Sequence, residues 1–431
     1  MKHLPFYFKI TFLTLLLCFS FANAQKKGTT KTDKIKHLHS DLIEANPEKY
    51  EGNPLFTGNV IFEHKGAKLY ADSVILYNIA SQKNTFESDV KIENSEYTVT
   101  SSRANHYNAK EEVEFFGPSV IQSKRNAKDR IVTTEGRYNL KSQESFLTSP
   151  STIYYDDKIL KGNNLYFNQR TGYGKATGNF VLEEPLEDRI LSGNLGEVFR
   201  NNDSVSIKQN ALFEKKLEKE SLFFRADNMI AVEKNKQKLV RAFDNAKVFK
   251  SDLQGIADSI VFDQSQDIIY MHGNPVAWSS ENQITGDSIF VYTRNREEEV
   301  DSIDVMGHAF AVSKVEESQG ADEYNQIKGK TMDIAVENSQ IKNIKVNSNA
   351  NMLIYLDDKQ KGKETERIGV NHSYCGVIYI EFLNKDPELL QCQIGSNSKV
   401  YPMEELPKEI KLLPDFKWLE SKRPKSKADL Q

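Results

Sequence analysis

The sequence has few cysteines, few prolines and no long apolar run. Only three of its 431 residues are Cys and only 12 are Pro, whereas Phe and Tyr number 24 and 18. Few prolines and many aromatic residues are typical of β-strands. The apolar run from Ile10 to Phe21 is shorter than the roughly 20 residues that a bilayer-spanning helix needs, so it does not predict one.

Familiar catalytic and phosphate-binding motifs are also missing. Neither a nucleophile elbow nor a Walker motif occurs. The glycine-rich run 172–178 is followed by the apolar residues 180–182, which indicates a hairpin turn rather than a phosphate loop. The eight histidines lack the spacing of a local metal site. We therefore predict that the protein is not an enzyme and has no cofactor and no bound metal.

The chain carries slightly more negative than positive charge. The formal net charge is −4, and removal of residues 1–24, which contain Lys2 and Lys9, would change it to −6. This balance argues against nucleic acid as a partner. One basic cluster near the N-terminus fits either a solvated leader or a contact with acidic lipid headgroups on a membrane surface. It consists of Lys26, Lys27, Lys31, Lys34 and Lys36.

Residues 1–24 have the features of a signal peptide. Basic residues precede the apolar run, and the small-residue site Ala22-Asn23-Ala24 follows it. We predict cleavage after Ala24, export, and a flexible basic leader over residues 25–45.

A short pattern recurs along most of the chain. A strand and a turn precede a small or polar residue, which we call the anchor, and a second strand follows it. Three units are near copies, at Asp72–Tyr77, Asp258–Asp263 and Asp287–Tyr292. Such repeats indicate stacked supersecondary units. The anchors, 27 to 33 residues apart except for a last interval of 43, are Ala71, Ser102, Glu135, Gly162, Gly193, Ala226, Ala257, Gly286 and Gly329.

The positions after the anchors form an apolar stripe. The fifth position after each anchor is apolar in every unit, the third is mostly apolar, and the fourth is mixed. Because alternate side chains of a strand point to opposite faces, the third and fifth positions share one face. We predict that this face is turned inward and includes Val74, Leu76, Tyr107, Tyr138, Leu140, Leu165, Phe167, Met229, Ile260, Phe262, Ile289 and Val291.

Each unit has room for two strands of ordinary length and two turns. The sequence therefore predicts an elongated, all-β, antiparallel array with one module at 46–200 and a second, continuous module at 201–395. A Pro-containing tail at 396–431 would dock on an end of the array, and its last residues, 422–431, would fray. The apolar residues expected to dock it are Leu412, Leu413, Phe416, Trp418 and Leu419.

The units also contain recurring aspartates, which could suggest a row of carboxylates for calcium or for acid–base chemistry. Each follows an anchor at a turn, and the equivalent position in other units holds Arg103, Gly136 or Lys330, which a metal row would not tolerate. We interpret the aspartates as turn residues that accept local backbone hydrogen bonds. They are Asp72, Asp227, Asp258 and Asp287.

Cys375 and Cys392 flank a predicted hairpin. Export would permit a disulfide between them. The sequence gives no Cα separation, so both the bridged and the unbridged form stay open; a bridge would be structural.

The repeat resembles that of a known family. Gly58-Asn59-Val60 followed by Leu69 to Val74, and Gly273-Asn274 followed by Ile284 to Ile289, are similar to the repeat of the OstA-like family. This family includes periplasmic lipopolysaccharide-transport proteins of the LptA type. The resemblance covers residues 46–395. It implies a folded-over β-jellyroll, open along one edge, whose interior holds lipid acyl chains.

The resemblance implies a periplasmic protein, with an outer-membrane association among the options, that shields the acyl chains of lipopolysaccharide or of a lipid A-like glycolipid within the inward stripe. Its partners would be other β-jellyroll transport components, bound through edge strands. The array is about twice as long as one such module, which leaves a bridge and an accessory role open. The same periodicity fits a non-enzymatic scaffold with a sealed interior that binds protein or polysaccharide on its outer face. An open apolar groove would favour transport and a closed core would favour the scaffold.

Overall fold

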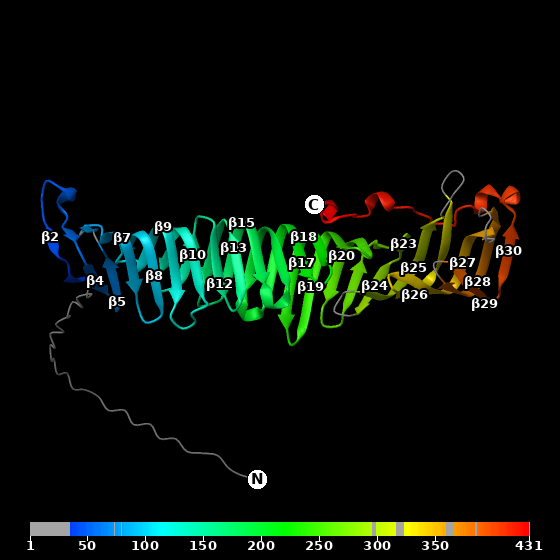
Figure 1. Cartoon of the computed structure of the whole chain (residues 1–431), viewed down its shortest axis with the longest axis horizontal. Helices are drawn as coiled ribbons and strands as arrows, with labels where there is room; N and C mark the ends of the chain where they lie inside the picture. The colour runs from blue at the N-terminus through cyan, green and yellow to red at the C-terminus, as the bar shows by residue number, and fades with distance from the viewer. Residues whose placement is uncertain are drawn as a thin grey trace, which may run out of the picture.

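The computed structural model describes residues 35–72, 74–78, 80–294, 299–315, 323–358, 366–383 and 386–430. These residues form one 30-stranded antiparallel sheet in which most strands pair with their neighbours in sequence. The other elements in these ranges are short 3-10 turns. The molecule is elongated, and its strands follow one another along the long axis (Figure 1). The predicted elongated all-β architecture is confirmed.

The sheet folds over itself because its strands bend near their middle. Where β17 (Ser204–Lys216) pairs with β18 (Ser221–Lys234), the register passes directly from Lys208 to Ala211. The residues between them, Gln209 and Asn210, have φ of 61° and 65°. Bulges of this kind bend a strand sharply. We call these bends corners; similar pairs lie at Gly58–Asn59, Ser88–Asp89, Gly178–Asn179, Asp244–Asn245, Gly273–Asn274, Gly307–His308 and Ser348–Asn349.

The corners divide the sheet into two layers, which we name layer A and layer B. The strands that cross a corner and belong to both layers are β7 (Lys83–Glu93), β8 (Tyr97–Tyr107), β9 (Glu112–Ser123), β10 (Arg130–Asn139), β15 (Tyr173–Glu184), β16 (Arg189–Phe199), β17, β18, β19 (Gln237–Lys250), β20 (Leu253–Asp263), β25 (Glu299–Lys314), β26 (Tyr324–Glu337), β27 (Gln340–Asp358) and β28 (Glu366–Leu383).

Shorter strands belong to one layer each. Layer A has β2 (Leu42–Glu44), β3 (Leu55–Thr57), β6 (Val74–Asn78), β11 (Glu144–Leu147), β14 (Asn164–Asn168), β21 (Ile268–His272), β24 (Ser288–Arg294) and β29 (Asp386–Gln393). Layer B has β1 (Lys36–His39), β4 (Val60–His64), β5 (Ala67–Ala71), β12 (Ser151–Tyr155), β13 (Lys158–Gly162), β22 (Val276–Ser279), β23 (Asn282–Thr285) and β30 (Asn397–Tyr401). The 3-10 turns are η1 (Tyr50–Gly52), η2 (Pro185–Glu187), η3 (Arg200–Asn202), η4 (Met403–Glu405), η5 (Lys408–Ile410), η6 (Glu420–Lys422) and η7 (Lys427–Leu430).

One apolar core runs between the two layers, from Ile35 to Ile380. Alternate residues of each strand point into it, as the period of two requires. Phe213 from layer B meets Phe262 from layer A with ring centroids 6.2 Å apart. The sheet and its core continue across residues 200 and 201, because β16 pairs with β17.

The N-terminal strands lie in the segment that we expected to be a flexible leader. β1 pairs with β4, and β2 pairs with β3. The ring of His37 packs 4.8 Å from that of Phe56 and 5.2 Å from that of Phe62, centroid to centroid. The leader prediction is therefore wrong for residues 36–44, because an aromatic contact fixes them to the sheet. The predicted signal peptide and residues 25–34 lie outside the described ranges.

Residues 403–430, which we call the strap, run back from the C-terminal end of the array along its side (Figure 1). Leu413 packs with Val312 and Tyr324 in a second apolar cluster, on the outer face of layer B. Leu430, near the end of the strap, is buried. The expected docking on an end of the array and the expected fraying after residue 422 are both wrong, because layer B offers the strap an apolar outer face.

Cys375 and Cys392 form a disulfide, with their Cα atoms 5.7 Å apart. Cys375 is buried in β28, and Cys392 on β29 packs against the core. The bond therefore joins the last long strand to an edge strand at the C-terminal end of the array.

Candidate functional site

Most of the predicted inward stripe lies in the core between the layers. Leu140 is partly buried and packs against that core. The side chain of Val74 lies outside the described set. A contact between these residues and a lipid stays a prediction. The fully or almost fully buried members are Tyr138, Leu165, Phe167, Met229, Ile260, Phe262, Ile289 and Val291.

Leu76 does not lie in the core, contrary to the prediction. Its neighbour Ile75 is fully buried, so Leu76 points to the opposite face. The cause is the length of the corner. Two residues separate the buried residues Ala257 and Ile260, whereas three separate Ala71 from Ile75. One additional residue inverts the alternation in the first unit.

Tyr107 also points outward, and its prediction is wrong for a related reason. Its hydroxyl donates to the Oε2 atom of Glu114 at 2.8 Å, while the adjacent His106 is fully buried. The buried residues that flank this corner are Ser101 and Ala104. The anchor was therefore placed one residue too late, and the stripe in this unit was shifted to the outer face.

The recurring aspartates lie at the corners, and two of them have partners on the neighbouring strand. The Nδ2 atom of Asn245 donates to Asp227 Oδ2 at 2.7 Å, and Asp287 lies 3.0 Å from Nδ1 of His308. These bonds join neighbouring strands, where we had expected bonds to the local backbone. Within the described ranges, no group of three or more His, Cys, Asp or Glu side chains could hold a metal ion. The exposed corner aspartates are Asp72, Asp227, Asp258 and Asp287.

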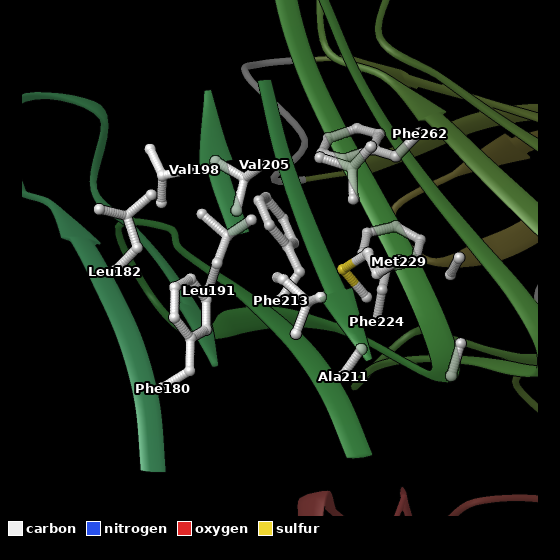
Figure 2. Packing of buried hydrophobic residues seen from close by; sticks show 14 of the residues in the cluster. Phe180, Leu182, Leu191, Val198, Val205, Ala211, Phe213, Phe224, Met229 and Phe262 are labelled. Carbon is white, nitrogen blue, oxygen red and sulfur yellow. The ribbon is translucent and has the colours of Figure 1, made fainter. Parts of the chain in front are cut away.

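The space between the layers is filled by side chains. Phe180, Phe213 and Phe262 are each completely buried. Figure 2 shows them with Leu182, Leu191, Val198, Val205 and Met229, projecting from neighbouring strands into the same space. The interior is therefore a closed core in this conformation, as the scaffold interpretation expects.

The hairpin turns of layer A meet those of layer B along one line, which we call the seam. Its contacts are polar and mostly exposed at the surface. Exposed ion pairs of this kind contribute only about 0–1 kcal/mol each. The seam is therefore held much more weakly than the core behind it. Contacts across it include Lys65–Glu111 at 2.5 Å, Gln143–Glu96 at 2.5 Å, Arg200–Asp156 at 2.5 Å and Ser280–Ser339 at 2.8 Å.

Near the middle of the array the seam contains buried charges. Arg189 is 8% exposed and Glu184 is 4% exposed. The Arg189 guanidinium donates to Glu184 in layer B, and its Nη2 atom donates to Glu233 Oε2 in layer A at 3.0 Å. Lys158 Nζ lies 2.6 Å from the second oxygen of Glu184. We call this group the Arg189 network; it connects the two layers.

Both central groups of the Arg189 network are charged at neutral pH. Burial is the largest single influence on Glu184 and opposes its ionisation. The hydrogen bond and charge of Arg189, together with Lys158, outweigh burial and hold the pKa of Glu184 below its usual value. Burial likewise opposes the charge of Arg189, but Glu184 and Glu233 raise its pKa above the usual value. Loss of one partner would therefore leave a buried charge uncompensated.

A cavity of about 90 Å³ lies beside this network. Its apolar wall includes Val198, Val205 and Leu239, which project from strands of layer A. A second hollow, of about 290 Å³, shares the charged rim. Tyr155 lines the first cavity, and its hydroxyl is buried without a hydrogen-bond partner among the described residues. Burial, with a smaller effect from the charge of Glu184, raises the pKa of Tyr155.

Two histidines that are distant in sequence meet inside the N-terminal part of the array. The rings of His64 and His106 lie 5.0 Å apart, centroid to centroid, and both side chains are buried. Burial, then the repulsion from His64, lowers the pKa of His106 to about 3. Sequence spacing did not reveal this pair, because its members come from strands of different layers.

The Arg189 network was not predicted from the sequence, although the alternation contains the signal. Glu184 continues the inward series of Phe180 and Leu182, and Arg189 begins the series that continues with Leu191. Two charged residues at inward positions on either side of one turn predict a buried ion pair. We had followed only the apolar members of the stripe.

The fold and its interior define a class of protein: an elongated, folded-over antiparallel β-jellyroll with one apolar interior along its length. No helix of the described ranges is long and apolar enough to cross a bilayer. Residues 32–183 match the family described as OstA-like protein. Residues 191–298 match the family described as LptA/(LptD N-terminal domain) LPS transport protein. These two matches confirm the predicted resemblance to the OstA-like family.

Other comparisons add less. One solved structure with similarity is LptH from Pseudomonas aeruginosa, described as the LptA-homologous periplasmic component of the lipopolysaccharide transport device. It is 13% identical, with a TM-score of 0.26, over 36% of this chain and 100% of LptH. No curated protein sequence matches the chain.

Proposed function

We propose that this protein shields the acyl chains of lipopolysaccharide, or of a related lipid A-like glycolipid, in its interior during transport through the periplasm to the outer membrane. The observation that carries the proposal is the continuous apolar core, in a chain whose two segments match OstA-like and lipopolysaccharide-transport families. The protein acts as a carrier and performs no chemical reaction on the lipid.

Because the core is closed, lipid binding requires the layers to separate along the seam. Burial of ten methylene groups would stabilise a bound chain by roughly 8 kcal/mol before ordering costs, at about 0.8 kcal/mol per group. The polar contacts of the seam oppose separation only weakly. Acyl chains would then replace the contacts that the two layers make with each other, so that apolar surface stays covered in both states.

The ends of the array would bind further transport components of similar fold. β1 and β2 at one end, and β29 and β30 at the other, each pair on one side only among the described strands. Unpaired strand edges add to a neighbouring sheet by backbone hydrogen bonds. The exposed side chains of Leu42 and Val400 give these edges additional apolar surface. The basic leader would contact acidic lipid headgroups at a membrane.

Photo-crosslinking in cells tests the lipid path. A photoreactive phenylalanine at Phe167 or Phe262 is expected to form adducts with lipopolysaccharide. The matched controls, Tyr166 and Val261, are the preceding residues on the same strands and belong to the outer face; they should form none. Equal labelling at the inward and outward positions, or no lipid at either inward position, contradicts the proposal.

The scaffold interpretation is the second candidate, because the closed core favours it. In that case the interior never opens, and a protein or polysaccharide binds the outer face. Native mass spectrometry of the purified protein with extracted envelope lipid separates the two functions. A stoichiometric lipid adduct supports transport, and its absence together with a protein or polysaccharide partner supports the scaffold.

A further inference from the structure

The polar contacts of the seam differ along its length in how deeply they are buried. They are buried most deeply near the middle of the array. At Lys65–Glu111 the ion pair joins side chains that are 36% and 20% exposed. At the Arg189 network the pair that crosses the seam joins Arg189, whose side chain is 8% exposed, to Glu233, whose side chain is 37% exposed, and Arg189 also pairs with the buried Glu184 of its own layer. The contact there extends inward from the surface, to the level of the apolar residues of the core.

The position of the charges explains this depth. Glu184 ends β15 and Arg189 begins β16, on either side of the turn η2, and both point to the inner face. Glu233, near the end of β18, reaches Arg189 from the opposite layer. Lys238, at the start of β19, joins the same network by pairing with Glu233 at 3.4 Å, and it also lies 2.6 Å from Glu187 of η2. At this place ionic groups occupy positions that carry apolar side chains elsewhere in the array.

A cavity and two polar groups without partners among the described residues lie near these charges. The cavity of about 90 Å³ joins the charged rim to Val198, Val205 and Leu239 of the apolar interior. The buried Tyr155 hydroxyl on its wall has no hydrogen-bond partner within the described ranges. The Nε2 atom of Gln264, whose side-chain oxygen accepts a bond from Arg189 at 3.5 Å, is buried and without a partner there as well. Buried polar groups of this kind normally have partners; Tyr155 lines the cavity, and Gln264 is bonded to Arg189, which lines it too.

We propose that the Arg189 network is a side portal through which one acyl chain of an amphiphilic glycolipid enters the interior between the two layers. Separation of Arg189 from Glu233 opens the seam at this point. The chain then lies against Val198, Val205 and Leu239, while polar groups of the lipid bind the hydroxyl of Tyr155 and the amide of Gln264. The portal rests on the proposed transport function, and adds a lateral route in the middle of the array to entry at its ends.

The charges keep the portal closed when no lipid is present. Arg189 and Glu184 stabilise each other, and the hydrogen bond from Arg189 to Glu233 joins the two layers at this point. An exposed apolar gap at the same place would attract other apolar surfaces. Because polar groups cover the apolar interior at this place, no apolar surface is exposed there. The two layers still separate at this point without disrupting the core.

Crosslinking across the seam tests the portal. In the purified protein, Asp156→Cys/Arg200→Cys places two thiols across the seam at the cavity rim and leaves the Arg189 network intact. The matched control, Lys65→Cys/Glu111→Cys, does the same at the N-terminal part of the seam. Each variant is studied before and after reaction with a short bis-maleimide. The measurement is the rate at which the protein takes up lipid A with a fluorescent acyl chain.

We expect the crosslink at 156 and 200 to slow uptake at least tenfold, and the crosslink at 65 and 111 to change it less than twofold. The rate of each reacted variant is compared with that of the same variant before reaction, and circular dichroism shows that both unreacted variants are folded. Uptake at an unchanged rate with the 156–200 crosslink overturns the portal but leaves the transport function intact. Failure of the wild-type protein to bind the lipid even at equilibrium overturns the transport function, and the portal with it.

A second variant tests the network itself. Glu184→Gln/Arg189→Leu removes both buried charges together, so that neither is left unpaired. It should speed uptake at least tenfold, because the buried Arg189 no longer has to separate from Glu233. The exposed pair Lys342 and Glu337, 3.1 Å apart, supplies the matched control Glu337→Gln/Lys342→Leu, for which no change is expected. Equal rates in the two double variants contradict the assignment.

Discussion

Polar side chains enter the core of this protein mainly at the ends of strands, next to the seam. Glu184 and Arg189 flank a turn, and His64 and His106 lie on β4 and β8 within a residue of their last positions. The strand interiors between corner and turn carry apolar residues such as Phe213 and Phe262. Titration of these seam residues should therefore affect how the two layers associate.

His106 makes stability sensitive to acid. Its folded-state pKa of about 3 lies below the ordinary value of 6.5, so the unfolded chain binds a proton that the folded chain excludes. Its effect is absent above pH 6.5, and stability is lost progressively as the pH falls from 6.5 toward 3. At about 1.4 kcal/mol per pH unit, the loss between pH 6.5 and 5 is roughly 2 kcal/mol. Urea unfolding of wild type and His106→Leu at both pH values measures this, and the variant should lose less.

The buried surroundings of His106 matter for this prediction. The groups that face it are His64 from β4 and Asn84 and Asn108 from layer A, and the ion pair of Lys65 and Glu111 lies at the adjacent seam. The exposed His272 supplies the control: His272→Leu should leave the pH dependence unchanged. If His106→Leu and wild type lose the same stability on acidification, His106 does not control this response.

At the scale of elements, the strap is fixed by a row of glutamines on layer B. Gln283 Nε2 donates to the carbonyl of Lys417 at 2.7 Å, and its side-chain oxygen accepts from the amide of Leu419 at 2.6 Å. Gln326 makes the same pair of bonds to the strap at residues 411 and 413. Both glutamines pair with Val312 across β25, so they lie on one line perpendicular to the strands. The strap follows this line.

Loss of the glutamines should detach the strap. Each of their hydrogen bonds contributes roughly 0.5–1.5 kcal/mol net. Gln283→Ala/Gln326→Ala should therefore increase cleavage of the strap by a protease at low concentration about tenfold or more, while the sheet stays folded by circular dichroism. The exposed Gln340→Ala is the matched control. Resistance of the double variant equal to that of wild type would show that apolar contacts such as that of Leu413 hold the strap alone.

At the scale of the whole molecule, local alternation predicted the architecture well. The period of two placed Phe167, Met229 and Phe262 in the core, because burial of one face is a property of each strand by itself. It failed at Leu76, where one additional residue at the corner inverts the faces, and at Tyr107, where the corner begins one residue before the assigned anchor. The length of a corner depends on how the layers fold over each other, which a single strand does not encode.

Contacts between segments that are distant in sequence could not be predicted from the repeat either, because a single strand does not encode them. The course of the strap depends on the outer face of layer B, and the Arg189 network depends on two turns that meet only after the sheet has folded over. The family resemblance supplied the folded-over shape and the expected function, but not these contacts. Charged residues at inward positions are the signal that would have indicated the network.

The array as a whole should be less stable toward its N-terminal end. Each strand contacts mainly its neighbours, so opening at one place depends on local contacts rather than on the entire molecule. The strap covers part of layer B between β18 and β26, and the disulfide joins β28 to β29, whereas neither reinforces β4 to β10.

Hydrogen exchange should therefore be faster at the paired amides of β8 and β9 than at those of β25 and β26. Removal of residues 402–430 should accelerate exchange in β25 and β26 and leave β8 and β9 unchanged. Equal protection at both ends of the wild-type protein would instead mean that the two layers open as one cooperative unit, and that a lipid could enter only when the whole seam separates.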